Sequence, residues 1–151
     1  MSGRIHVVDD DPSFLRAIAR FLGHAGYEVA TYATAQHLLD NLPTDTKASC
    51  LLIDVRMPDL DGPALQQRLG ELGSTLPIIF LTAYADTPLV VKTLKRGAFD
   101  FLTKPVASDD LLHAVEKALR HQQASRDQES RLDDIRDRIA KLTPRERPGL
   151  Y

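Results

Sequence analysis

Short apolar runs alternate along the chain with longer segments in which apolar residues return at helical spacing. The runs have the length of strands, whereas the spaced segments match the 3.6-residue period of an α-helix. The pattern predicts five strands, at residues 4–8, 28–32, 50–53, 77–81 and 99–102. It predicts five helices, at residues 12–25, 35–41, 62–72, 88–96 and from Ser108 onward. Asp11 suits the cap of the first helix, because Pro12 follows it at the first helical position.

This alternation predicts an α/β fold, with a five-stranded parallel sheet and helices on both faces. The strands are apolar throughout, as expected of a sheet that is covered on both sides. In such sheets, functional side chains gather at the carboxyl ends of the strands, beside the point where the strand order reverses. The polar residues that lie at or just after predicted strand ends are Asp9, Asp10, Asp54, Thr82 and Lys104.

Three of these residues are acids, and their chemistry indicates a cation site. Ionised carboxylates that lie close together repel one another, so Asp9, Asp10 and Asp54 favour a hard divalent cation such as Mg²⁺. An aspartate can also accept a phosphoryl group, as in enzymes that form an aspartyl phosphate. Lys104 would then offer positive charge to that group, and the hydroxyl of Thr82 would offer a neutral hydrogen bond.

Taken together, the motifs at the strand ends resemble the receiver domain of bacterial two-component response regulators. They are Val7-Val8-Asp9-Asp10, Leu52-Ile53-Asp54-Val55-Arg56-Met57-Pro58 with Asp61-Gly62, Leu81-Thr82-Ala83, and Gly97-Ala98 with Phe101-Leu102-Thr103-Lys104-Pro105. The resemblance covers about residues 4 to 121 and implies a flavodoxin-like fold. It also implies a phosphoacceptor that catalyses its own phosphoryl transfer and loses the group slowly, and not a conventional enzyme.

The resemblance assigns a metal-binding and phosphate-accepting role to the acids. Asp54 would accept a phosphoryl group from a sensor histidine kinase. Asp10, Asp54 and the backbone carbonyl of Arg56 would ligate Mg²⁺, and Asp9 would bind the cation through water. Because Asp9, Asp10 and Asp11 follow one another, the family's acidic pair could be Asp9 and Asp10 or Asp10 and Asp11. The strand end at Val8 favours Asp9 and Asp10.

The resemblance also implies a switch. Lys104 would contact the phosphoryl group, and the peptide bond before Pro105 would be cis. Once the acceptor is phosphorylated, the hydroxyl of Thr82 would turn toward the phosphoryl oxygens, and the ring of Phe101 would move into the vacated space. Many receivers carry tyrosine at the Phe101 position, so here only packing can report the state. The alternative is that Phe101 is an ordinary core aromatic.

Two further expectations concern the surface around the acceptor. Arg56 and Tyr84 flank it at positions that in this family tune how fast the phosphoryl group is lost, and we expect both side chains to shield it from water. The surface built from residues 87–96 and 99–102 is expected to mediate homodimerisation on phosphorylation.

The C-terminal third predicts a linker. We divide the chain into a receiver domain at 1–121, a helical linker at 122–142 and the truncated start of a DNA-binding domain at 143–151. In the linker, apolar residues step by three, four and three positions at Leu132, Ile135, Ile139 and Leu142. That spacing fits a coiled-coil seam or a lone amphipathic helix, because fewer than three heptads are apolar.

The last residues resemble the opening of the helix-turn-helix domain of FixJ-type and other LuxR-like regulators. Thr143 suits an N-cap, with Pro144 at the first helical position and Glu146 completing a capping box. A three-helix DNA-binding unit cannot be built from the residues that follow. The chain is therefore expected to be a truncated regulator or a protein that ends here, and DNA binding is expected only through a missing domain.

Composition narrows the class of protein without naming a function. The 151 residues, 43% of them apolar, can bury one core. A net charge of −2 is not the basic balance of a nucleic-acid-binding domain. No apolar stretch is long enough to span a bilayer and no signal peptide is evident, so a cytoplasmic location is expected.

Three other functions compete with that of a receiver domain in a transcription regulator. A phosphatase or phosphotransferase of the haloacid dehalogenase type needs a second acid two residues after the nucleophile, where this chain has Arg56. A flavin carrier needs a phosphate-binding loop after the first strand, where three acids would repel the phosphate. A stand-alone receiver that acts through protein–protein contacts, without DNA binding, is the third.

Overall fold

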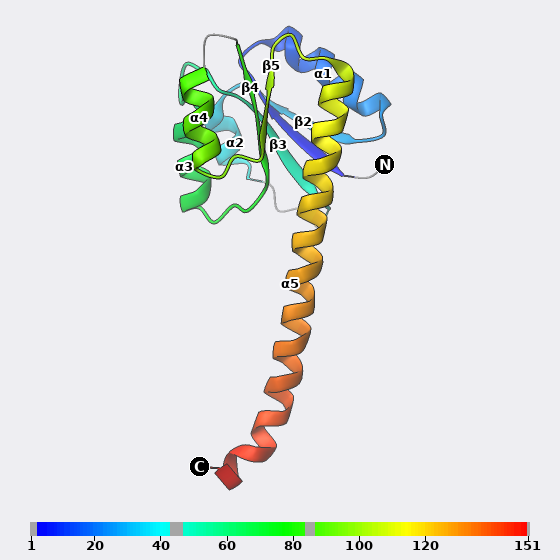
Figure 1. Cartoon of the computed structure of the whole chain (residues 1–151), viewed down its shortest axis with the longest axis vertical. Helices are drawn as coiled ribbons and strands as arrows, with labels where there is room; N and C mark the ends of the chain where they lie inside the picture. The colour runs from blue at the N-terminus through cyan, green and yellow to red at the C-terminus, as the bar shows by residue number, and fades with distance from the viewer. Residues whose placement is uncertain (1–2, 43–46, 84–86, 151) are drawn as a thin grey trace.

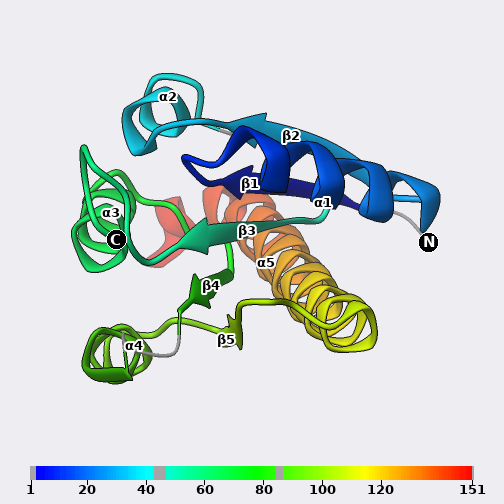
Figure 2. The same ribbon diagram turned by 90° about the horizontal axis from the view of Figure 1, so that it is seen from above.

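The parallel sheet has the expected five strands. The computed structural model describes residues 3–42, 47–83 and 87–150, with side chains described as far as Ala140. The strands lie side by side in the order β2-β1-β3-β4-β5 (Figure 2). They are β1 (Arg4–Val8), β2 (Glu28–Tyr32), β3 (Ser49–Asp54), β4 (Ile78–Thr82) and β5 (Asp100–Thr103). The predicted α/β class is therefore confirmed, and each predicted strand boundary lies within one residue of the observed one.

Helices cover both faces of the sheet, and each face has its own apolar cluster. The helices are α1 (Pro12–His24), α2 (Ala35–Asp40), α3 (Gly62–Glu71), α4 (Thr87–Lys95) and α5 (Ser108–Leu150). Helices α1 and α5 pack on one face, where Ile5, Leu52 and Leu81 are fully buried. Helices α2 and α3 pack on the other face around Val8, Ile53 and Phe80, with Leu89 of α4 at the edge. Figure 1 shows the resulting three layers.

Local chemistry fixes where α1 and α3 begin. The side chain of Asp11 accepts hydrogen bonds from the backbone N–H groups of Ser13 and Phe14, which confirms Asp11 as the cap of α1. Gly62 begins α3 where the backbone passes very close to the core. A Cβ atom there would lie 2.8 Å from the ring of Phe80 and 3.0 Å from the Cα of Val55, so a larger residue would displace the helix.

Helix α5 continues far beyond the sheet (Figure 1). Among its side chains described up to Ala140, the last buried one is Gln122, whose Oε1 accepts a hydrogen bond of 3.3 Å from the backbone N–H of Ser49. Farther along, Leu132, Ile135 and Ile139 are 45%, 50% and 57% exposed. Among the described residues, no helix combines the length and apolar character that a membrane span requires.

One predicted helix cap was wrong, whereas the division of the chain into three regions stays a prediction. Thr143 was expected to cap a new helix, but the backbone is helical without a break from Ser108 to Leu150. Capping is a local preference that neighbouring residues can override. Lys141, Leu142 and Arg145 favour a helix but Pro144, Pro148 and Gly149 disfavour one, so the propensities of these residues do not explain why the helix continues.

Candidate functional site

Neighbouring strands carry the predicted residues to one edge of the sheet. Asp9 and Asp10 follow β1, and Asp54 ends the adjacent strand β3, where Val8 lies beside Ile53. Thr82 ends β4 next to Thr103 of β5, and Lys104 follows directly. The chain passes from β1 to β2 on one side and later to β3 on the other, so the acids lie where the strand order reverses.

The three acids form one cluster. Carboxylate oxygens of Asp9, Asp10 and Asp54 all lie within 4.8 Å of one another. Asp9 is fully buried, Asp54 is 9% exposed, and Asp10 is open to solvent. Oxygen ligands from several carboxylates, with one side open to water, fit a hard divalent cation that keeps part of its hydration shell. The donor set therefore fits Mg²⁺.

Lys104 brings the opposite charge to the cluster. Its Nζ donates to Oδ2 of Asp9 at 2.7 Å and to Oδ2 of Asp54 at 3.4 Å. The backbone N–H of Lys104 donates to the carbonyl of Thr82, which ties the loop after β5 to the end of β4. The peptide bond between Lys104 and Pro105 is cis, as expected.

Backbone groups hold the two buried carboxylates. Oδ1 of Asp9 accepts a hydrogen bond of 2.9 Å from the N–H of Asp11, and Oδ1 of Asp54 accepts one of 3.1 Å from the N–H of Arg56. Each acid is thereby fixed by the turn that follows its own strand. Arg56 itself is exposed. The structure does not test its carbonyl as a metal ligand, so that role stays a prediction.

Burial and neighbouring charges act in opposite directions on the pKa values of Asp54 and Lys104. Burial raises the pKa of Asp54, and the Arg56 N–H and the charge of Lys104 offset this only in part. Burial lowers the pKa of Lys104, but its hydrogen bond to Asp9 and the charges of Asp54 and Asp9 outweigh burial, so the net shift is upward. Lys104 therefore keeps its positive charge readily, whereas burial disfavours the charged form of the Asp54 carboxylate.

Thr82 and Phe101 both line a hollow of about 230 Å³. Thr82 is buried, and its hydroxyl donates to the carbonyl of Ala83 at 2.8 Å. The ring of Phe101 is 40% exposed, so in this conformation the ordinary core-aromatic interpretation is wrong. The hollow, also lined by Val90 and Leu94 of α4, leaves space for a side-chain movement.

Sequence reasoning did not find one neighbour of the cluster. The Nζ of Lys104 lies 4.5 Å from the centroid of the Phe14 ring, which comes from α1. Helical spacing placed Phe14 on the apolar side of that helix, and nothing in the sequence pairs it with a lysine 90 positions later. Tyr84, predicted to flank the acceptor, lies outside the described residues.

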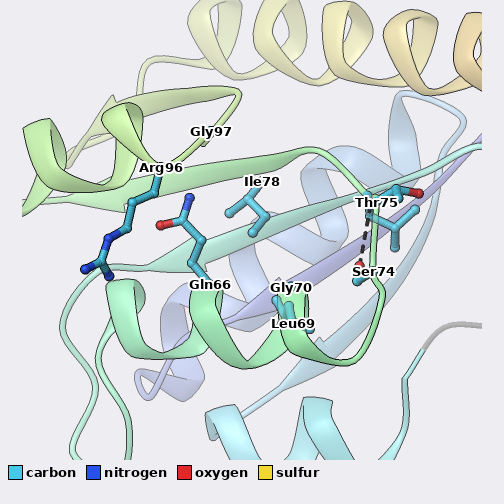
Figure 3. A pocket seen from close by; sticks show the side chains of 9 residues that line it. Gln66, Leu69, Gly70, Ser74, Thr75, Ile78, Arg96 and Gly97 are labelled. Atoms are coloured by element: carbon cyan, nitrogen blue, oxygen red, sulfur yellow. Dashed lines mark hydrogen bonds between the residues drawn. The ribbon is translucent and has the colours of Figure 1, made fainter.

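A second hollow, of about 200 Å³, lies away from the cluster (Figure 3). It is bordered by α3, by the loop before β4 and by the turn after α4, and Ile78 at its floor begins β4. Here Nε2 of Gln66 donates to the carbonyl of Thr93 and joins α3 to α4. The hollow therefore lies at the amino ends of the strands, away from the acids.

Comparison with known proteins agrees with this geometry. Residues 5–116 match the family model described as the response regulator receiver domain. This chain belongs to the response regulator receiver family. It is a receiver domain of the kind found in two-component response regulators, and its sheet, acid cluster and lysine lie where its motifs led us to expect them.

The alignments with relatives cover almost all of this chain, including its long helix. The chain is 40% identical to the transcriptional regulatory protein FixJ of Bradyrhizobium diazoefficiens, covering 96% of this chain and 70% of FixJ. It is 34% identical to the response regulator protein TmoT of Ectopseudomonas mendocina, covering 97% of this chain and 66% of TmoT. It is thus similar to receiver domains of the FixJ and TodT type, and it spans about two thirds of each relative.

Solved structures support the same assignment. The response regulator StyR superposes with a TM-score of 0.88 at 34% identity, covering 97% of this chain and 74% of StyR. Full-length FixJ from B. japonicum superposes with a TM-score of 0.77 at 40% identity, covering 96% of this chain and 71% of FixJ. Because both matches extend over more than the receiver domain, they include the long helix α5.

Proposed function

We propose that Asp54 is the phosphoacceptor of this receiver domain and that a sensor histidine kinase is the donor. The single observation that supports this most is the cluster of three carboxylates within 4.8 Å at the strand-order reversal, with the ammonium of Lys104 touching two of them. A nucleophile, a place for a cation and a fixed positive charge are thereby combined at one edge of the sheet.

In the proposed step, an oxygen of Asp54 forms a bond to phosphorus while the bond from phosphorus to the donor nitrogen breaks. Lys104 offsets the negative charge that arrives with the phosphoryl oxygens. Mg²⁺ would be held by Asp10, Asp54 and the carbonyl of Arg56, with Asp9 bound through water. When bound, the cation neutralises phosphoryl charge and orients the group.

Phosphorylation is proposed to move Thr82 and Phe101 together. The hydroxyl of Thr82 now donates to its neighbouring carbonyl, a weak local bond that a phosphoryl oxygen can replace. Its rotation would open the hollow behind it to the ring of Phe101. A local change of charge would in this way alter the surface formed by α4 and β5.

That surface is the proposed site of homodimerisation. Val91 and Leu94 of α4 are 45% and 38% exposed, and they lie with Phe101 around the same hollow. Inward movement of the ring would change the shape of this apolar patch. The exposed side chains of Leu132, Ile135 and Ile139 on α5 would add a second contact between the two copies.

The output and the phosphoryl lifetime are further parts of the proposal. Control of transcription would need a DNA-binding domain in addition to the residues described, and the location would be cytoplasmic. Arg56 and Tyr84 would shield the phosphoryl group from water. If so, Arg56→Ala and Tyr84→Ala each shorten the half-life of the phosphorylated protein, and an unchanged half-life in both removes this part of the proposal.

One experiment tests the acceptor. The chain is incubated with acetyl phosphate and Mg²⁺, and its intact mass is measured. We expect the mass of one phosphoryl group to be gained by the wild type and by the control Asp127→Asn, and not by Asp54→Asn. Phosphorylation that persists in Asp54→Asn contradicts the choice of acceptor. No gain in the wild type instead favours a receiver that acts through protein–protein contacts alone.

A further inference from the structure

The ammonium of Lys104 is held from more than one direction. Asp9 and Asp54 each accept a hydrogen bond from it, at 2.7 and 3.4 Å. The ring of Phe14 lies against the same ammonium, with its centroid 4.5 Å away. The three contacts come from the turn after β1, from the end of β3 and from α1, so the position of one flexible side chain depends on three separate parts of the fold.

Phe14 is itself tied to the acid cluster through a short chain of hydrogen bonds. Its backbone N–H donates to the side chain of Asp11 at 3.4 Å. The N–H of Asp11 donates in turn to Oδ1 of Asp9, whose other oxygen accepts from Lys104. The first turn of α1 therefore fixes both the carboxylate that binds the ammonium and the ring that lies against it.

The contact has the distance at which an aromatic face attracts a cation. The face of the ring carries partial negative charge, and ammonium groups within about 6 Å of the centroid are attracted to it. A lysine side chain has many rotamers, and ordering it costs conformational entropy. The side chain of Lys104 is 28% exposed, so without the ring it would have room to turn toward solvent.

We propose that Phe14 is a positioning residue for phosphoryl transfer, because its ring face holds the ammonium of Lys104 beside Asp54. This inference rests on the proposed phosphorylation of Asp54. Phe14 touches neither reactant and acts only through the lysine. Its ring carries no titratable group, so the effect comes from the electrostatic field of the ring and not from acid–base chemistry.

A plain packing role is the competing explanation. Phe14 also lines an apolar groove between α1 and the start of α5, together with Phe21, Val106 and Leu111. Loss of the ring could therefore disturb the packing of α1 rather than the lysine. The two explanations differ in one respect: fluorine atoms on the ring weaken its attraction for a cation but leave its apolar volume nearly unchanged.

The test replaces Phe14 in the full chain with mono-, di- and trifluorinated phenylalanine. The initial rate of phosphoryl gain from acetyl phosphate is followed by intact mass. We expect the rate to fall stepwise with each fluorine, by about threefold to tenfold over the series. Phe14→Leu falls at least as far, and Phe14→Trp keeps or raises the rate. Urea unfolding, unchanged along the fluorinated series, shows that packing is intact.

Two controls make the result specific. Fluorination at Phe21, which lines the same groove, leaves the rate unchanged. In a Lys104→Met background, fluorination at Phe14 has no effect, since the cation is gone. A rate that does not respond to fluorine in the wild-type background overturns the inference, and so does an equal response in the Lys104→Met background.

A spectroscopic reading separates failure of this inference from failure of the proposed function. The ring should shift the nuclear resonances of the Lys104 ε-methylene protons, and Phe14→Leu should abolish that shift. If the shift is absent in the wild type, the ring is not over the lysine, and the inference is wrong whatever Asp54 does. If the shift is present but the wild type takes no phosphoryl group, the proposed function fails and the positioning role falls with it.

Discussion

The surroundings of Asp54 disfavour its charged form, whereas those of Lys104 favour its charged form, so the pKa of each group is raised. Burial opposes the charge of Asp54 and raises its pKa, whereas the acids around Lys104 more than compensate for the burial of the lysine. Because its charged form is disfavoured, the carboxylate of Asp54 is suited to bind a cation and to accept a phosphoryl group. The stability of the domain should therefore depend on which of these two residues is removed.

For Asp54→Asn we expect a higher free energy of unfolding at pH 7. A carboxyl group whose pKa is raised by folding binds its proton more tightly in the native state, so its contribution falls as pH rises from the unfolded pKa through the folded one. The gain of the variant over the wild type should thus grow with pH from about pH 4, the unfolded pKa, and level off above the folded pKa. Urea titrations at several pH values measure it, and a gain that shrinks with pH contradicts the prediction.

For Lys104→Met we expect a loss of stability of about 2 kcal/mol at neutral pH, because fully buried Asp9 loses its charged donor. The pKa of Lys104 is raised by folding, so its contribution is complete below the unfolded pKa and is lost as pH rises through the folded pKa. The difference from wild type should stay constant between about pH 7 and 9 and vanish only above about pH 10. Lys117→Met, at an exposed site, is the control.

At the scale of elements, α4 and β5 carry the exposed apolar patch and α3 offers a comparison. We expect Leu94→Arg to weaken phosphorylation-dependent dimerisation about tenfold or more, without lowering phosphoryl uptake. Leu72, just after α3, is 50% exposed and does not line that hollow, so Leu72→Arg should have no effect. Analytical ultracentrifugation of the phosphorylated proteins measures this. Equal effects of the two substitutions would exclude the α4–β5 surface.

Pairing of α5 is limited by charge as well as by length. In a parallel, in-register pair with Leu132 and Ile139 at a positions and Ile135 at d, Arg131 would face Arg136 of the second copy. Arg131→Glu should therefore raise the dimer affinity of the phosphorylated protein about twofold to threefold. Ser130→Glu, on the opposite side of the helix, should not. If neither variant changes the affinity, α5 is a lone amphipathic helix.

The elements were predictable, and the contacts between distant ones were not. Alternating apolar periods located every strand and helix start within one residue, because those periods are local. The strand-end motifs likewise located the acids and Lys104. The outward position of the Phe101 ring and the contact between Phe14 and Lys104 depend on how helices dock, which no local pattern records. At Thr143 a local capping signal did not begin a new helix, because the backbone is already helical there.

At the scale of the whole molecule, the acid cluster links ion binding to global stability. An ion that binds only the folded domain stabilises it by about 2.7 kcal/mol at a hundred times its dissociation constant. We expect Mg²⁺ to raise the melting temperature of the wild type and of Asp127→Asn, and EDTA to reverse this. Asp10→Asn should lose most of the effect. A full response in Asp10→Asn would show that the ion binds elsewhere.

The hydrogen bond between Gln122 and Ser49 fastens α5 to the sheet. Beyond it the helix runs on to Leu150, a lever arm roughly 40 Å long at 1.5 Å per residue. A tilt of the helix by about 5° at Gln122 would move its far end by about 3 to 4 Å. An adjustment too small to matter within the sheet would thus become, at the tip, a displacement comparable to the spacing of packed side chains.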